Sequence, residues 1–209
     1  MTLRLGKRIL PFLSALLLSI GSPSGHADVA PITTNGNQLL FGGSPGSIAG
    51  PSLFWSNNGW GGEKYYTAGA VQTVAQDWNA TLIRAAMGVD EDGGYLEDPT
   101  GNLSKVRTVV DAAIANDLYV IIDWHSHHAE DYTQSAVDFF QQMASEYGQH
   151  NHVIYEIYNE PLSVSWSGTI KPYAEEVISA IRAIDPDNLI VVGTPTWSQD
   201  VDAAERAGH

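Results

Sequence analysis

The chain has 209 residues, a formal net charge of −14 at pH 7 and no cysteine. Its acidity argues against nucleic acid and anionic membrane surfaces as partners, because like charges repel. The lack of cysteine excludes thiol nucleophiles, Cys-based zinc sites and disulfides, so a fold of this size must be stabilised by its hydrophobic core.

The first 27 residues have the pattern of an export signal. An apolar run at 9–20 is too short to span a membrane, and Gly25 and Ala27 occupy the small-residue positions of a cleavage site. Basic residues precede the run: Arg4, Lys7 and Arg8. The alternative is a hydrophobic first helix of the mature domain. We expect a signal peptide at 1–27 and a secreted, monomeric protein with one domain at 28–209 and no membrane association after cleavage.

Beyond this segment, a Gly-rich stretch at 32–50 with an Asn-Gly pair predicts a small hairpin. Five short apolar runs then follow, at 52–55, 80–86, 118–123, 152–158 and 188–194. Each precedes an amphipathic stretch typical of a helix, at 65–78, 102–116, 132–147, 170–185 and 199–207. Apolar strands that alternate with helices predict parallel βα units, whose strands are buried on both faces.

Two α/β architectures contain such units, an open doubly wound sheet and a (β/α)8 TIM barrel. No Gly-rich phosphate loop follows the first run, which argues against the doubly wound class. Polar or aromatic residues instead come just after several strands: Trp55, Asn57, Arg84, His125, Asn159, Glu160, Thr196 and Trp197. In a barrel these positions meet at the carboxyl ends of the strands, where barrel enzymes keep their active sites. A complete barrel needs ~250 residues, so five units predict the first part of one.

The segment VIYEIYNEP at 153–161 ends an apolar strand on Asn159 and Glu160. A carboxyl group at a barrel mouth is suited to act as a general acid on a glycosidic oxygen, and Asn159 is suited to bond a sugar hydroxyl. The alternative is a turn with a solvated Glu160. A partner carboxylate is harder to find. Glu156 on the same strand lies ~13 Å away, whereas the carboxyls of glycosidases are ~5–9.5 Å apart.

The segment IDWHSHH at 122–128 places His125 and His127 two residues apart after a strand. Paired imidazoles are common metal ligands, so a metal-dependent barrel hydrolase is one interpretation. Later strands supply no clear further ligands, and we favour His125 as a hydrogen-bonding site residue, with no metal and no cofactor. Arg84 is suited either to keep a neighbouring carboxylate ionised or to form an interior ion pair without a catalytic role.

Five blocks occur in order within 32–209: SLFWSNNGWGGEKYY, IRAAMGV, IDWHSHH, VIYEIYNEP and VGTPTWSQDV. Together they resemble the secreted cellulases of glycoside hydrolase family 5. The resemblance implies a (β/α)8 barrel that hydrolyses internal β-1,4-glucosidic bonds with retention and without a cofactor. By position it implies Glu160 as the acid/base, Asn159 as its amide neighbour, and Arg84 as the residue that steadies the nucleophile. It also implies His125 as a site histidine, Trp197 as the aromatic on the leaving-group side, and Trp55 as a wall of the cleft.

The family pattern continues with a His-x-Tyr pair after strand six, a nucleophilic Glu after strand seven and a Trp after strand eight. This chain ends before these positions. We therefore expect the chain to be the N-terminal part of an endo-β-1,4-glucanase catalytic domain. We expect this part to be inactive alone because it lacks the nucleophile. The alternatives are a non-catalytic carbohydrate-binding protein and a metal-dependent hydrolase that uses His125 and His127. The expected partner of the glucanase is a β-1,4-glucan or cello-oligosaccharide.

Overall fold

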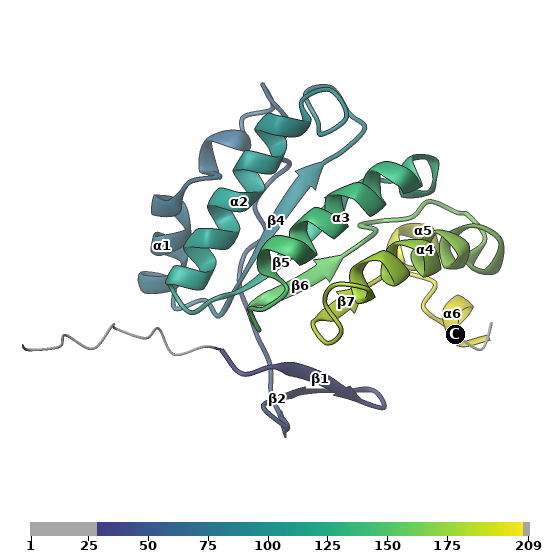
Figure 1. The fold of residues 1–209 in the computed structure, drawn as a ribbon, viewed down its shortest axis with the longest axis horizontal. Helices are drawn as coiled ribbons and strands as arrows, with labels where there is room; N and C mark the ends of the chain where they lie inside the picture. Colours follow the sequence, from purple (N-terminus) through teal and green to yellow (C-terminus); the bar gives the residue numbers. More distant parts are fainter. Residues whose placement is uncertain (1–28, 207–209) are drawn as a thin grey trace, which may run out of the picture.

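The computed structural model describes residues 29–206. The predicted signal peptide at 1–27 lies outside these residues. The described part of the chain contains a small antiparallel sheet, followed by a parallel sheet that is covered by helices (Figure 1). None of the helices between residues 29 and 206 is long and apolar enough to cross a lipid bilayer.

The predicted hairpin is present as a three-stranded antiparallel sheet. Its strands are β1 (Ile32–Asn35), β2 (Gln38–Phe41) and β3 (Ser44–Pro45), in the order β1-β2-β3. The register leaves a two-residue loop between β1 and β2, and Gly36 occupies its first position with a φ of 61°. Glycine adopts this conformation at no steric cost, which suits the tight turn of a hairpin.

The second sheet consists of β4 (Leu82–Gly88), β5 (Tyr119–His125), β6 (Val153–Glu156) and β7 (Leu189–Val191), all parallel and in sequence order. The longer helices are α1 (Ala68–Gln76), α2 (Pro99–Ala115), α3 (Thr133–Tyr147) and α4 (Lys171–Arg182). The shorter ones are η1 (Glu63–Tyr65), η2 (Ala129–Tyr132), η3 (Trp166–Ile170), α5 (Pro195–Ser198) and α6 (Asp202–Arg206). Figure 1 shows α1 to α4 side by side in the order of the strands. The strands lie in the order of the sequence, as in a barrel. A doubly wound sheet would instead contain a point where the strand order reverses.

The first of the five predicted strands, at 52–55, is not regular. It makes one parallel bridge to β4, between Ser52 and Arg84. Two residues further along β4, the Ala86 carbonyl oxygen accepts from the N–H of Ser56. In a regular parallel strand that starts from the bridge, the N–H of Trp55 would make this bond. One extra residue therefore lies between the two contacts, as in a β-bulge, and it changes the direction of Trp55. The other four predicted strands are confirmed as β4 to β7.

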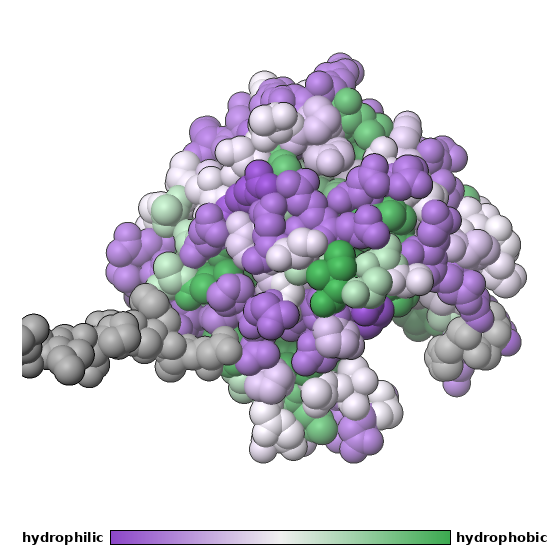
Figure 2. Space-filling view, in the orientation of Figure 1, coloured by the Kyte–Doolittle hydropathy of each residue, from purple (hydrophilic) through white to green (hydrophobic). Residues whose placement is uncertain are grey.

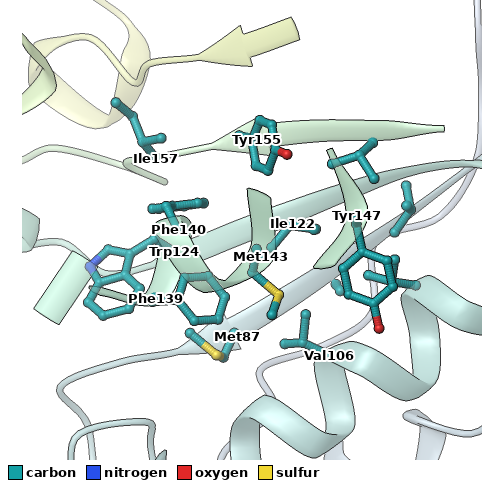
Figure 3. Close-up of a cluster of buried hydrophobic side chains, with 14 of the residues drawn as sticks. Met87, Val106, Ile122, Trp124, Phe139, Phe140, Met143, Tyr147, Tyr155 and Ile157 are labelled. Carbon is teal, nitrogen blue, oxygen red and sulfur yellow. The ribbon is translucent and has the colours of Figure 1, made fainter. Parts of the chain in front are cut away.

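The larger hydrophobic core lies between the parallel sheet and the helices (Figure 3). Every second residue of a strand faces the helices, as in Ile83, Ala85 and Met87 on β4 and Val120, Ile122 and Trp124 on β5. The ring of Trp124 packs on two aromatic residues of α3, with centroid distances of 5.4 Å to Phe139 and 6.3 Å to Phe140. This alternation leaves the remaining strand residues on the other face of the sheet, which we call the inner face.

The inner face carries a smaller apolar cluster near the amino ends of the strands. Ile32 of the hairpin is buried there against Tyr119 and Ile154, with further apolar neighbours in Val29, Phe41, Ile48, Leu82, Ile121 and Leu189. The rings of Phe41 and Tyr119 lie edge to face at 5.8 Å, and the Tyr119 hydroxyl donates to Ala30 O at 2.7 Å. The hairpin therefore covers the amino ends of the strands, below the sheet in Figure 1.

The surface over the helices is largely hydrophilic, as Figure 2 shows. Several exposed aromatic side chains, including Phe54 and Trp78, lie near the β4 edge of the sheet. Together with Leu53 and Val74 they line a groove of about 630 Å³. Segment 51–56 and β7 thus form the two edges of the parallel sheet within the described part of the chain.

Truncation of Ile83 tests the sheet–helix core. Ile83 is fully buried, so Ile83→Ala should lower the free energy of unfolding by about 2–5 kcal/mol, through lost burial and the cavity that remains. Ile184 lies exposed after α4, and Ile184→Ala should change the same quantity by about 0.5 kcal/mol or less. Urea unfolding followed by tryptophan fluorescence measures both. Equal effects of the two variants would contradict this description of the core.

Candidate active site

Three ionisable side chains meet on the inner face, above the apolar cluster. Arg84 on β4, Asp123 on β5 and Glu156 on β6 each come two residues after an apolar inner-face residue, namely Leu82, Ile121 and Ile154. Arg84 Nε lies 2.7 Å from Glu156 Oε2, and Arg84 Nη2 lies 3.1 Å from Glu156 Oε1. The same Nη2 is 2.8 Å from Asp123 Oδ2. One guanidinium therefore pairs with two carboxyl groups from two other strands.

Burial governs the ionisation of this cluster. It raises the pKa of Asp123 to about 8, although the charge of Arg84 opposes the shift. Burial and the neighbouring Asp123 also raise the pKa of Glu156, again against Arg84. For Arg84, burial disfavours the charge, but Asp123 and Glu156 outweigh it and raise the pKa of the guanidinium. Arg84 is therefore the permanent cation on which both carboxyl groups depend.

His125 lies two residues beyond Asp123 on the same face of β5. Its Nδ1 is 2.5 Å from Asp123 Oδ2, a distance that requires a proton between the two atoms. Burial, followed by the charge of Arg84, lowers the pKa of His125 to about 3, so the imidazole is neutral at pH 7. Asp123 thus fixes the orientation of the ring and leaves its other nitrogen for a further hydrogen bond.

Asn159 lies beyond the last residue of β6 and is oriented by Arg84. Its Oδ1 accepts from Arg84 Nη2 at 2.7 Å, whereas its Nδ2 is buried and has no partner among residues 29–206. A buried amide donor without a partner is costly, which is typical of a group that awaits a ligand. The donor is held in place because the other end of the same amide is bonded to a buried cation.

Glu160 is next to this amide, and its side chain is 47% exposed. His127 Nδ1 lies 3.0 Å from Glu160 O and 3.9 Å from Glu160 Oε2. On the other side, Gly193 N donates to Tyr158 O at 3.1 Å, and a Cβ on Gly193 would approach that oxygen to 2.6 Å. The glycine allows the chain after β7 to run close beside the segment that carries Glu160.

Trp55 borders the same site from the β4 side. Its ring stacks on Trp60 with a centroid distance of 5.3 Å and an interplanar angle of 28°. It also meets the ring of His125 edge to face at 4.2 Å and lies 6.0 Å from His127. The bulge after Ser52 places this tryptophan against the predicted site histidine.

Trp197 borders the site from the β7 side and is exposed. Its N–H donates to Pro161 O at 2.8 Å, directly after Glu160. The φ values of Thr196, Trp197 and Ser198 are 61°, 54° and 60°, in the left-handed region. Such a backbone costs about 1–3 kcal/mol for residues other than glycine, and it clusters at active sites and ligand-binding loops.

Two residues of the cluster were not expected from the sequence. Asp123 carries no sequence prediction, although its place two residues before His125 puts both side chains on one face of the strand. Glu156 was considered only as a distant partner of Glu160, whereas the structure makes it the partner of Arg84. The interior ion pair that the sequence allowed for Arg84 is thus present.

The His-x-His pair is not arranged as a metal site. Within residues 29–206, no three His, Asp or Glu side chains are grouped so that they could hold a metal ion. The Nδ1 atoms of His125 and His127 are directed instead to Asp123 and to Glu160 O, respectively. Asn57, another residue after a predicted strand, donates through Nδ2 to the main chain of Glu91 and Asp92 and holds the loop after β4.

Parallel βα units with a polar cluster at the carboxyl ends of the strands define an enzyme of the barrel class. The family described as Cellulase (glycosyl hydrolase family 5) matches residues 35–207, and the chain belongs to this family. Endoglucanase Z of Dickeya dadantii is 63% identical over 191 residues, which are 91% of this chain and 45% of that protein.

Solved structures of the family have the same fold. One from Cytophaga hutchinsonii is similar with a TM-score of 0.81 and 47% identity, over 85% of this chain and 57% of that chain. The catalytic domain of Thermobifida fusca endoglucanase Cel5A (E5) is similar with a TM-score of 0.76 and 36% identity. The match covers 85% of this chain and 60% of that chain. A variant of that domain has been solved with cellotetraose. The parallel sheet is therefore part of a (β/α)8 TIM barrel, and the chain spans about half the length of the curated relatives it matches.

Removal of the Arg84 charge should strongly destabilise the protein. Arg84→Met leaves two buried carboxyl groups without their cation, and should lower the free energy of unfolding by about 3–5 kcal/mol. Arg107 makes a similar two-bond contact with Glu146 on the surface, and Arg107→Met should cost about 1 kcal/mol or less. Urea denaturation compares the two variants. A loss at Arg84 no larger than that at Arg107 would be inconsistent with a buried ionic cluster.

The depressed pKa of His125 predicts how stability depends on pH. The folded imidazole stays neutral down to a pH of about 3, whereas the unfolded one takes a proton near pH ~6.5. The stabilising contribution is present above pH ~6.5 and is lost as the pH falls towards 3. Between pH 6.5 and 5, this effect should lower the free energy of unfolding by about 2 kcal/mol.

Two measurements check this prediction. The ring signals of His125 in nuclear magnetic resonance spectra should not move between pH 8 and 5 in the folded chain, but should titrate in urea. Over the same interval His125→Asn should lose less stability than the original chain. A native titration midpoint near ~6.5 would rule out the buried neutral imidazole.

Proposed function

We propose that this chain carries the acid/base side of the active site of an endo-β-1,4-glucanase that retains configuration at the anomeric carbon. The observation that supports this most directly is the pairing of Glu160 with Asn159. A half-exposed carboxyl group lies next to a buried amide whose Nδ2 is unpaired and whose Oδ1 is fixed by Arg84. Such a pair suits the protonation of a glycosidic oxygen beside a bonded sugar hydroxyl.

In this proposal Glu160 acts twice. As an acid it donates its proton to the glycosidic oxygen while the bond to the anomeric carbon breaks. As a base it then takes a proton from the water that attacks the glycosyl-enzyme intermediate. Asn159 Nδ2 donates to a hydroxyl of the sugar, and the neutral His125 offers a second uncharged contact in the same cleft.

The nucleophile of this reaction lies outside residues 29–206 in our proposal. Retention requires a second carboxylate ~5–5.5 Å from the first. Asp123 and Glu156 are both bonded to Arg84 within the sheet, so neither is free to attack a sugar. Arg84 is placed to steady further negative charge above it, as the family resemblance implies.

The substrate that we propose is a β-1,4-glucan or cello-oligosaccharide. The Thermobifida fusca relative has been solved with cellotetraose, and other relatives carry the name endoglucanase. Trp55 and Trp197 lie on opposite sides of Glu160 and suit the apolar faces of consecutive sugar rings. The signal-like segment at 1–27 supports secretion, and the small hairpin and acidic surface are compatible with a monomer.

A second candidate function is carbohydrate binding without hydrolysis. The stacked pair Trp55 and Trp60, together with the exposed Trp197, supports it, because these rings need no partner carboxylate to hold a sugar. Binding and hydrolysis are separable, since Glu160→Gln removes the transferable proton but leaves the tryptophans in place.

A chimera tests the proposed reaction. This chain replaces the matching part of Dickeya dadantii endoglucanase Z, and the product is assayed on carboxymethylcellulose. We expect turnover by the chimera and a loss of about 100-fold or more in kcat with Glu160→Gln, because a general acid contributes on this scale. Cellotetraose affinity, measured by calorimetry, should remain within about threefold in the same variant.

The 209-residue chain alone provides the complementary measurement. We expect it to bind cellotetraose through Trp55 and Trp197 and to show no turnover, because in our proposal the nucleophile lies outside its described residues. Normal turnover by this chain, or full activity of the Glu160→Gln chimera, would refute the assignment of Glu160. Binding by a chimera that never hydrolyses would favour the second candidate.

A further inference from the structure

His127 is attached at two points to the segment that carries Glu160. Its Nδ1 lies 3.0 Å from Glu160 O, and its own carbonyl oxygen accepts from the Tyr158 hydroxyl at 3.0 Å. Because a carbonyl oxygen only accepts hydrogen bonds, Nδ1 must carry a proton. The ring is therefore held in one tautomer, with this N–H 3.9 Å from Glu160 Oε2.

Tyr158 reaches His127 from the buried side of the sheet. Its side chain is fully buried, and its ring packs edge to face on Tyr173 at a centroid distance of 5.5 Å. Burial and the Glu130 carboxylate raise the pKa of Tyr158, so its hydroxyl stays protonated. Tyr158 thus points into the core on the helix side of the sheet, whereas Glu160, two residues later, lies at the mouth of the site.

Glu130 completes the link from the loop after β5. Its Oε2 contacts the Tyr158 hydroxyl, and Glu130 itself belongs to η2. The same loop is braced internally: the Thr133 hydroxyl donates to Glu130 O at 2.9 Å, and His128 N donates to Ser126 Oγ at 2.9 Å. A buried hydroxyl therefore joins a braced loop to the segment that carries Glu160.

We propose that Tyr158, together with Glu130, is a positioning residue for the acid/base: its hydroxyl fixes His127, and the Nδ1–H of His127 holds the main chain of Glu160. This inference rests on the proposed role of Glu160. The Glu160 side chain is half exposed, so its useful orientation depends on the few groups that approach it. The hydrogen bond from His127 to the main chain of Glu160 restricts the backbone that carries the carboxyl group, and thereby its position.

The kinetic test uses Tyr158→Phe in the endoglucanase Z chimera. This variant keeps the ring that packs on Tyr173 and removes only the hydroxyl. We expect kcat to fall about tenfold with KM within about twofold, because a displaced acid weakens the transition state more than substrate binding. An unchanged kcat would overturn the proposal.

Tyr155→Phe is the matched control. Tyr155 is also a fully buried tyrosine of the β6 chain, and its hydroxyl donates to the Asp185 carboxylate at 2.7 Å. The control therefore removes a tyrosine–carboxylate hydrogen bond of the same kind away from Glu160. We expect it to lower the melting temperature and to leave kcat within about twofold. Equal losses of kcat in the two variants would show a merely structural effect and overturn the proposal.

A double-mutant cycle tests whether Tyr158 acts through His127. His127→Ala alone should lower kcat, and the addition of Tyr158→Phe should then cause no further loss. Effects that multiply would mean that the two residues act independently, and would overturn the link. Full activity of Glu160→Gln would instead reject the proposed function, so the two failures are distinguishable.

A spectroscopic measurement on the 209-residue chain needs no turnover. In nitrogen-15 spectra of the imidazole groups, His127 should show the Nδ1–H tautomer in the original chain. In Tyr158→Phe we expect a mixture of tautomers, whereas Tyr155→Phe should keep the original pattern. The same His127 spectrum in all three proteins would overturn the proposed link.

Discussion

The rest of the site depends on one largely buried cation. Arg84 is bonded to Asp123, Glu156 and Asn159, and Asp123 in turn is bonded to His125. A guanidinium has five N–H donors in one plane, so a single side chain can satisfy several acceptors at once. A buried charge is costly unless it is paired, and the same holds for its carboxyl partners. The cluster is therefore stable only as a whole, which fixes the orientation of its uncharged members.

The place of this cluster follows from the register of the sheet. Asp123 lies directly beside Glu156, but Arg84 is paired with Ile121, one level nearer the amino ends. The long arginine side chain spans this offset and reaches the carboxyl groups above it. Below that level the inner face is apolar and is covered by the hairpin through Ile32 and Phe41. The hairpin covers the amino ends of the strands, and the polar groups lie at the opposite end, where we propose that the sugar binds.

The sequence predicted those features that depend on neighbours along the chain. Apolar runs identified β4 to β7, and the polar residues at or after their ends identified His125, Asn159 and Glu160. Arg84, expected just after a strand, lies within β4 instead, because that strand continues to Gly88. The irregular segment 51–56 was not predictable, because its bulge depends on a residue from outside the strand. The Tyr66 hydroxyl lies 2.9 Å from Phe54 O and 2.7 Å from Ala86 O and supports the chain where the ladder is broken. Asp123 was not predictable either, because the role of an acid within an apolar strand depends on Arg84 of the neighbouring strand.

Two sets of hydrogen bonds hold the segment that carries Glu160. One set is made by main-chain atoms and the other involves side chains, so the two differ in how far substitutions can change them. On the β7 side, main-chain bonds extend past the regular strand, from Gly193 N to Tyr158 O and from Trp197 N to Pro161 O. These bonds need only a glycine at 193 and a permissive backbone at 196–198. On the β5 side, the support comes from the side chains of His127 and Tyr158, which substitution can remove one atom at a time. The first support is fixed by the fold of the barrel, and the second is where changes of sequence can adjust the proposed acid/base without disturbing that fold.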